Sequence, residues 1–297
     1  MQAATALRGR KADSGQAAGT GRRLGHLLVI PTAAWTLAFF VIPLVLITVF
    51  SFGTENLVTF NVNFGWTVSN YASFGSDLYL TTLLRSLALS LGTTTACALL
   101  GFPLAFFISR QRPRTQRVLL ACVIVPFWTS FLVRTYSWVN LLQTDGPADR
   151  LAFGITGHHL QILYSPASIA IGMTYSYLPL MVLPIYVALE RISPDLYAAA
   201  ADLGARPWRQ FRRVVFPLAL PGLIAGIIIV GVPAMGEYVI PEILGGGKTL
   251  MIGNIIVGQY LDVGDYPFGS ALAVSLMVIL MAMLFALRRV QPAVEAR

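Results

Sequence analysis

The sequence predicts an all-α membrane protein whose chain crosses the bilayer six times. Hydrophobic residues make up 56% of the 297 residues, charged residues make up only 11%, and the mean hydropathy is +0.70. Soluble domains carry about 25% charged residues. The apolar residues gather in runs near the roughly 20 residues that a helix needs to cross a bilayer. These runs predict spans at about 27–52, 80–109, 118–141, 167–189, 218–240 and 267–287.

Two short tails flank the predicted transmembrane domain, which covers residues 27–290. Residues 1–26 are rich in Gly, Ala, Ser and Arg and lack apolar periodicity, which indicates a mobile tail. The apolar run that follows is too long for a signal peptide, and no small-residue cleavage site ends it. Residues 291–297 form the second tail.

The basic residues predict the orientation of the chain, because Lys and Arg collect on the cytoplasmic side of a membrane. Of the 21 Lys and Arg residues, 17 lie in the N-terminal tail, in the connections after the second and fourth spans, and after the last span. Both termini and the loop 191–217 are therefore expected in the cytoplasm. In the opposite loops, near 53–79, 142–166 and 241–266, most of the charged residues are acidic. This bias either attracts a cationic ligand or a carrier protein, or is simply the outer half of the charge asymmetry.

The loop 191–217 reads as two short helices joined by a tight turn. Ser193 can cap the first helix and Pro194 suits its first position. Gly204 stands where a left-handed C-terminal cap is needed. Pro207 can start the second helix, and Pro217 is expected to break it.

The second helix is predicted to be amphipathic. One side carries Trp208, Phe211 and Val215, and another carries arginines at 206, 209 and 213. That pattern is typical of a helix lying on a membrane surface. An ordinary helical hairpin between two spans is the alternative.

This loop resembles the signature loop of inner-membrane permease subunits of binding-protein-dependent ABC importers. The family pattern is Glu-Ala-Ala, three residues, Gly, nine residues, and Ile-x-Leu-Pro. The chain has Ala198-Ala199-Ala200, then Gly204, then Val214-Val215-Phe216-Pro217 at that spacing. The resemblance implies a cytoplasmic coupling helix that docks on an ATPase. The residues expected to contribute are Ala198, Ala199, Ala200, Asp202, Gly204, Arg206 and Pro217, with Ala198 in place of the family's Glu.

The resemblance also implies a fold and a set of partners. The fold is that of a type I ABC importer permease in a bacterial inner membrane. The expected partners are two ATPase subunits that bind the ATP, a second homologous permease in a heterodimer, and a periplasmic or lipid-anchored substrate-binding protein. Membrane lipid surrounds the chain. No cofactor of its own, no metal and no nucleic acid are expected.

Two ionisable residues inside predicted spans mark a candidate substrate path, because charges in a bilayer are costly. Glu237 lies at the outer part of the fifth span, and Arg134 lies in the outer half of the third. Either could line a translocation path. The alternatives are a structural Glu–Arg pair, or side chains that reach the headgroups.

The segments around these residues resemble the spermidine/putrescine branch of the permeases, including relatives that carry opines. A polyamine is a flexible polycation, so carboxylates and aromatic faces are the expected lining. Glu237 with Trp128, Tyr136 and Tyr238 could supply them. The aromatic residues could equally belong to an interfacial belt.

Other function classes find little support in the sequence. There is no Walker A motif, so ATP must be hydrolysed by a partner, and the chain is expected not to be an enzyme. The alternatives are a permease for an opine or another small organic solute, or an intramembrane lipid-modifying enzyme. The enzyme would need clustered Asp, His or Cys near one membrane face. Cys97 and Cys122 lie in apolar runs, and His158 and His159 are interpreted as solvated loop residues.

Overall fold

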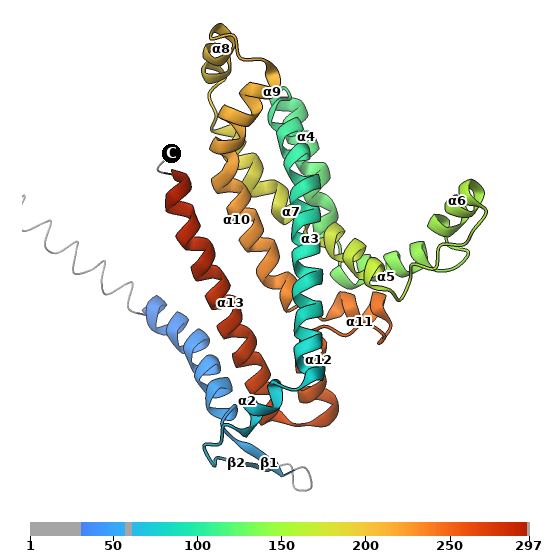
Figure 1. Ribbon diagram of the computed structural model, residues 1–297, viewed down its shortest axis with the longest axis vertical. Helices are drawn as coiled ribbons and strands as arrows, with labels where there is room; N and C mark the ends of the chain where they lie inside the picture. Colours follow the sequence, from blue (N-terminus) through green and yellow to red (C-terminus); the bar gives the residue numbers. More distant parts are fainter. Residues whose placement is uncertain (1–30, 57–60, 296–297) are drawn as a thin grey trace, which may run out of the picture.

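The structure, a computed structural model, is an elongated bundle of helices and describes residues 31–56 and 61–295 (Figure 1). The predicted mobile tail, 1–26, lies outside these residues. Five described helices are long and apolar enough to cross a membrane, and a bent pair of helices makes a sixth if its two parts are counted as one span. The expected α-helical membrane architecture is confirmed, with five to six candidate spans.

Three helices form the centre of the bundle: α3 (Asp77–Ser109), α7 (Pro166–Glu190) and α10 (Phe216–Met235). Their buried side chains form one apolar cluster that includes Phe102, Met181 and Ile185. Glycines bring the helices close together. A Cβ on Gly222 of α10 would lie 2.5 Å from the Pro184 carbonyl oxygen of α7. Close backbone approach through small residues is the usual way in which membrane helices associate.

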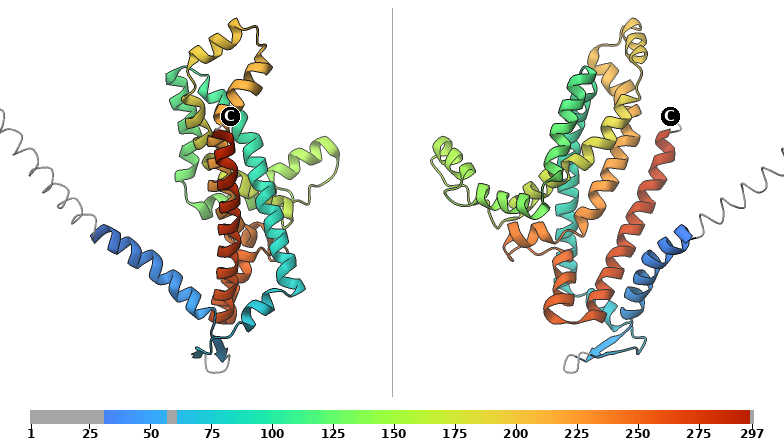
Figure 2. Two further views of the ribbon diagram at one scale, coloured as in Figure 1. Left: turned by 60° about the vertical axis from the view of Figure 1, so that its left-hand side comes forward. Right: turned by 180° about the vertical axis from the view of Figure 1, so that it is seen from behind.

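Two further helices lie beside this centre. The helix α13 (Tyr266–Glu295) packs on α10 and runs toward the same end of the bundle as the loop 191–217 (Figure 1). It continues through Glu295, past residue 290, where the C-terminal tail was predicted to begin. The helix Pro31–Phe50 leans away from the bundle, and its apolar window has no residue buried inside the chain (Figure 2).

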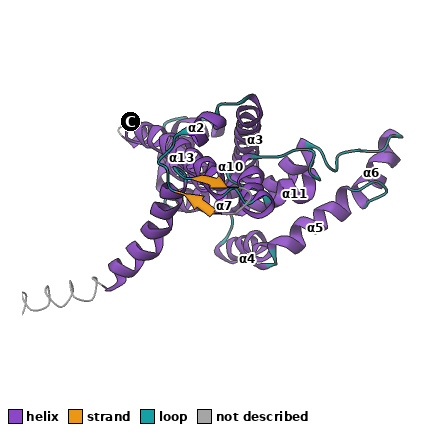
Figure 3. Ribbon diagram, turned by 90° about the horizontal axis from the view of Figure 1, so that it is seen from below, coloured by secondary structure: helices purple, strands orange, loops and turns teal. Residues whose placement is uncertain are grey.

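The third span is not the single straight helix 118–141 that the apolar run predicts. It consists of α4 (Pro113–Ile124), the 3₁₀ turn η1 (Val125–Trp128) and α5 (Phe131–Leu142), and α6 (Pro147–Thr156) continues from it. The two parts meet at an angle of 94°. Thr129 and Ser130 are extended, with ψ near 155° and 130°, so the helical hydrogen bonds stop there. As Figure 3 shows, α5 and α6 extend sideways from the bundle.

The fifth span also departs from its predicted limits, 218–240. The helical segment starts at Pro207 with α9 (Pro207–Gln210), passes through the π-helix η2 (Phe211–Val215) and ends at Met235. Pro217 therefore does not break a helix. It lies in the first turn of α10, next to a wide turn in which Phe216 N–H donates to the Phe211 carbonyl. The wider turn accommodates the missing proline N–H.

The remaining elements lie at the two ends of the bundle. The helices of the loop 191–217, α8 (Pro194–Asp202) and α9, are at one end. The antiparallel strands β1 (Thr54–Asn56) and β2 (Asn61–Asn63) are at the other, with α2 (Ser69–Phe74), α12 (Ile252–Gly258) and the π-helix η3 (Gln259–Val263). The short helix α11 (Val239–Gly245) lies at the side, against α5 and α7.

Candidate functional site

The first helix of the loop 191–217 has the caps that the sequence predicts. Ser193 Oγ accepts the Asp195 N–H at 3.2 Å, and Pro194 occupies the first helical position. Gly204 has φ +74°, the left-handed conformation. The Gly204 N–H donates to the Ala201 carbonyl at 2.8 Å, and the Ala205 N–H donates to the Ala200 carbonyl at 3.0 Å. This is a Schellman motif, which satisfies carbonyls at the end of α8.

The helix α8 presents a small, open surface at the end of the bundle. It contains no buried residue. Ala198, Ala199, Asp202 and Gly204 are exposed, Ala200 is half-buried, and Arg206 is exposed in the turn that follows. Pro217 is exposed too, but it belongs to α10, so the loop does not bring it into the α8 surface. The alanine side chains leave the backbone open to close approach by another protein.

The second helix turns most of its apolar side inward. Val215 is buried, and Phe211 is half-buried against Phe102 and Phe106 of α3. Trp208 stacks on Phe211 with 5.6 Å between ring centroids and remains 71% exposed. The arginines at 206, 209 and 213 are exposed. Packing inside the bundle therefore accounts for two of the three apolar residues, and Trp208 alone still faces outward.

Glu237 occupies the break between α10 and α11 and does not continue the fifth span. Its side chain is 9% exposed. Its Oε1 accepts the backbone N–H groups of residues 238, 239 and 240 at 3.1, 3.0 and 3.4 Å. Its Oε2 accepts the Tyr177 hydroxyl of α7 at 2.5 Å. The carboxylate thus satisfies the free N–H groups at the start of α11 and ties that helix to α7.

Arg134 braces the bend of the third span. Its guanidinium donates to the Pro126 carbonyl at 3.3 Å and lies 5.3 Å from the centroid of the Phe127 ring. Its Nε is buried and has no hydrogen-bond partner among the described residues. No ion pair joins Arg134 to Glu237 in the described part of the chain. Arg134 contacts Pro126, and Glu237 contacts Tyr177 and the backbone at the start of α11. The structural Glu–Arg pair considered from the sequence does not form in this structure.

The three aromatic residues predicted beside these charges remain open to their surroundings. Trp128 is 82% exposed, Tyr136 57% and Tyr238 44%. Tyr177, the residue that does contact Glu237, was not among the residues predicted from the sequence. It lies 60 residues earlier, within an apolar run, and only the packing of α7 on α11 brings the two together.

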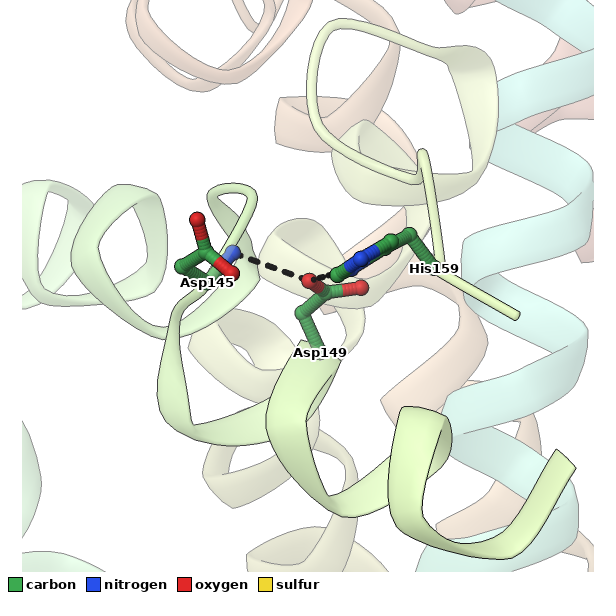
Figure 4. Close-up of side chains that lie close together, drawn as sticks. All are labelled: Asp145, Asp149 and His159. Carbon is green, nitrogen blue, oxygen red and sulfur yellow. Dashed lines mark hydrogen bonds and ion pairs between the residues drawn. The ribbon is translucent and has the colours of Figure 1, made fainter. Parts of the chain in front are cut away.

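A polar cluster in the loop 142–166 was also missed (Figure 4). The Asp149 carboxylate is 1% exposed. It accepts the Leu160 N–H at 2.6 Å and the Asp145 N–H at 2.9 Å, and its Oδ2 lies 2.7 Å from His159 Nδ1. His159 also stacks on Phe153. His159 is exposed, as expected of a solvated loop residue, but it also has a structural role, because it fastens α6 to the segment that leads into α7.

Comparison with known proteins gives a consistent set of relatives. Residues 98–297 match the family described as "Binding-protein-dependent transport system inner membrane component". The chain is 36% identical over 261 residues to the spermidine/putrescine transport system permease protein PotB of Salmonella typhimurium (strain SL1344), covering 87% of this chain and 91% of the relative. It is 32% identical over 249 residues to the inner membrane ABC transporter permease protein YdcU of Escherichia coli (strain K12), covering 79% of each.

Solved structures share the fold. A chain of a bacterial alginate ABC transporter, in complex with an alginate-bound periplasmic protein, matches with a TM-score of 0.65 at 17% identity, covering 89% of this chain and 92% of that one. A chain of the MetNI methionine ABC transporter in an inward-facing conformation matches with a TM-score of 0.56 at 23% identity, covering 72% and 95%.

The His159–Asp149 contact predicts a pH-dependent loop. The hydrogen bond that His159 donates to the Asp149 carboxylate raises the pKa of His159 above its usual 6.5. A group with a raised folded-state pKa contributes stability that is complete below its unfolded pKa and is lost as the pH rises through the folded value. Hydrogen exchange of residues 145–161, corrected for the intrinsic pH effect, should therefore be slower at pH 6 than at pH 8.5. The variant His159→Gln should remove this pH difference.

The neighbouring histidine provides the control for this prediction. His158 is exposed and makes hydrogen bonds only through its backbone in the described structure. His158→Gln should keep the wild-type pH dependence. Equal pH dependence in wild type and His159→Gln would contradict the assignment.

Proposed function

The chain belongs to the family of binding-protein-dependent transport system inner membrane components, and from this premise we propose that it imports a polyamine as the membrane-spanning subunit of an ATP-driven transporter. The observation that carries the choice of substrate is the 36% identity to the spermidine/putrescine permease PotB over 87% of the chain. The solved neighbours confirm the expected permease fold. The chain is a transport subunit and not an enzyme.

We infer that α8 is the coupling helix on which an ATPase subunit docks. Its open alanine surface and its Schellman turn support this role. Because the chain has no Walker A motif, two separate ATPase subunits would bind and hydrolyse the ATP. Closure of the ATPases would move the loop and rock the spans between outward-open and inward-open states. Ala198, in place of the family's Glu, removes one ionic contact from this interface.

The proposed assembly contains a second, homologous permease and a periplasmic or lipid-anchored binding protein. The sideways arm of α5 and α6 and the unburied helix Pro31–Phe50 leave apolar surface for the second permease or for lipid. The chain would lie in a bacterial inner membrane with both termini in the cytoplasm. The distribution of Lys and Arg supports this orientation. It is also supported by the position of α8 and the C-terminal end of α13 at the same end of the bundle.

The proposed path for the polyamine passes Glu237 and Tyr238, near the break between α10 and α11, and the bend that carries Trp128, Arg134 and Tyr136. Glu237 is a nearly buried carboxylate that the arginine of α5 does not neutralise. The exposed faces of the aromatic residues suit cation–π contacts with ammonium groups. An interfacial belt is the alternative explanation of this exposure.

The alternatives gain little from the structure. An opine or another small organic solute would use the same fold, and no contact among the described residues favours it. A lipid-modifying enzyme would need clustered acidic and histidine residues, and the Asp145, Asp149 and His159 group is such a cluster. The Asp149 oxygens are, however, occupied by two backbone N–H groups and His159. This geometry fastens a loop and supports no catalytic role.

The proposed function predicts loss of polyamine uptake when the gene is deleted in its source cell. Uptake of labelled spermidine and putrescine should fall to background and return with the wild-type chain. An affinity-tagged chain should co-purify with an ATPase subunit. Normal polyamine uptake in the deletion strain, with no second polyamine importer expressed, would contradict the substrate. Purification of the chain without any ATPase subunit would contradict the proposed role in an ATP-driven importer.

A matched pair of substitutions at Gly204 tests the coupling loop. A Cβ at this position would meet no atom within 4 Å, so only the left-handed backbone resists substitution. A β-branched residue resists this conformation strongly, whereas Asn tolerates it. Gly204→Val should abolish uptake while leaving membrane insertion intact, and Gly204→Asn should retain most of it. Normal transport by Gly204→Val would show that the turn does not transmit movement.

A second pair separates the charge of Glu237 from its capping role. Glu237→Ala leaves three N–H groups without an acceptor and should lower the free energy of unfolding by about 1–3 kcal/mol. Glu237→Gln keeps an acceptor oxygen and should assemble normally. If the charge binds an ammonium group, Glu237→Gln should raise the apparent KM for spermidine about tenfold, the effect of losing one hydrogen bond to a charged group.

Two outcomes would contradict these roles of Glu237. An unchanged KM in Glu237→Gln would remove the residue from the substrate path. If Glu237→Gln assembles poorly and Arg134→Gln rescues its assembly, the two residues form a structural pair after all, contrary to the geometry.

A further inference from the structure

The loop 191–217 follows α7 and leads into α10, so backbone movement reaches those two helices directly. The central helix α3 has no chain connection to the loop, although it packs along both α7 and α10. Movement of the loop can reach α3 only through contacts between side chains. The end of α3 nearest the loop is therefore the place to look for such contacts.

Arg110, which follows the last residue of α3, makes that contact. Its guanidinium carbon lies 3.7 Å from the centroid of the Tyr197 ring on α8. The same carbon lies 5.1 Å from the centroid of the Phe106 ring, one turn earlier on α3. The cation thus lies between an aromatic ring of the spanning helix and one of α8. Such contacts are attractive because the face of an aromatic ring is electronegative.

The contacts continue to the other side of the loop. The Phe106 ring meets the Phe211 ring of η2 edge-on, with 5.6 Å between centroids. Phe211 in turn contacts Phe102 of α3 at 5.8 Å and stacks on Trp208. A continuous row of side chains, Tyr197, Arg110, Phe106 and Phe211, therefore connects both helices of the loop to the end of α3. We call these four residues the loop clamp.

The charge of Arg110 is directed to the rings and not to a carboxylate. Arg110 forms no ion pair with any residue that the structure describes. Arg110, Tyr197 and Glu190 line one pocket of about 380 Å³. The Glu190 carboxylate in this pocket accepts the Tyr186 hydroxyl at 3.0 Å. The Tyr197 hydroxyl makes no hydrogen bond in the described structure, so Tyr197 contacts Arg110 through its ring alone. The helix α8 has no buried residue, which makes each side-chain attachment important for its position.

We propose that the loop clamp transmits movement of α8 to α3 and that Arg110 and Tyr197 are positioning residues for coupling. This inference rests on the proposed importer function, because it assigns the route by which ATPase movement reaches a helix not joined to the loop. Without the clamp, α8 can shift on its ATPase while α3 stays in place. ATP would then be hydrolysed with less transport.

The test measures spermidine imported per ATP hydrolysed in proteoliposomes that contain the complete transporter and its binding protein. Arg110→Gln and Tyr197→Leu should assemble normally, keep basal ATPase activity and lower this ratio about two- to fivefold, the range expected for one exposed cation–π contact. Tyr197→Phe retains the ring and should keep the wild-type ratio. Arg114→Gln removes an exposed arginine from the neighbouring helix α4 and should also keep it.

Amide exchange of residues 194–203 in the isolated chain provides a readout that does not need an ATPase. Arg110→Gln should speed this exchange, and Arg114→Gln should not. If the wild-type chain binds no ATPase, the proposed function fails, and exchange alone decides whether the clamp exists. A wild-type transport ratio in both Arg110→Gln and Tyr197→Leu would overturn the inference. Loss of assembly in both would do so too, because the contact would then serve only to build the complex.

Discussion

The close contact between α7 and α10 is the constraint on which the rest of the structure depends. At Gly222 a single added carbon would overlap the backbone of α7, so the two helices meet almost backbone to backbone. The loop 191–217 leaves the end of one of these helices and returns to the start of the other. Their contact therefore fixes where the loop begins and ends. It also fixes the groove into which α3 packs its apolar side chains.

Three interruptions of helices in the described part of the chain have specific hydrogen-bond partners. Glu237 accepts the free N–H groups where α10 gives way to α11, and Arg134 donates to the Pro126 carbonyl at the bend of the third span, which Thr129 also contacts. Gly204 closes α8 through its left-handed backbone. A bilayer offers no water to backbone groups, so breaks within a span need such partners. Glu237 and Arg134 are thus first of all structural residues, and any role in transport is added to that.

The coupling-loop end of the bundle and the sideways arm differ in how they are built. The end with α8 and α9 is open, basic and built around small residues, which suits contact with a soluble partner. In the loop 142–166, α6 is fastened by a buried carboxylate and a histidine. Between them, α3, α7 and α10 form a continuous packed body. The loop clamp joins the open end to the one central helix that the chain itself leaves unconnected.

The sequence by itself determined the number of spans, the two helices of the loop and the left-handed turn at Gly204. These features depend on local properties: the length of apolar runs, the geometry of proline and glycine, and hydrogen bonds between near neighbours. It did not determine the bend of the third span, the continuous helix through Pro217 or the limit of α10 at Met235. Nor did it indicate that Tyr177 meets Glu237, that Asp149 meets His159 or that Arg110 lies on Tyr197. Only the tertiary structure decided these, because each depends on packing, on a relaxed helical turn, or on side chains brought together from separate segments.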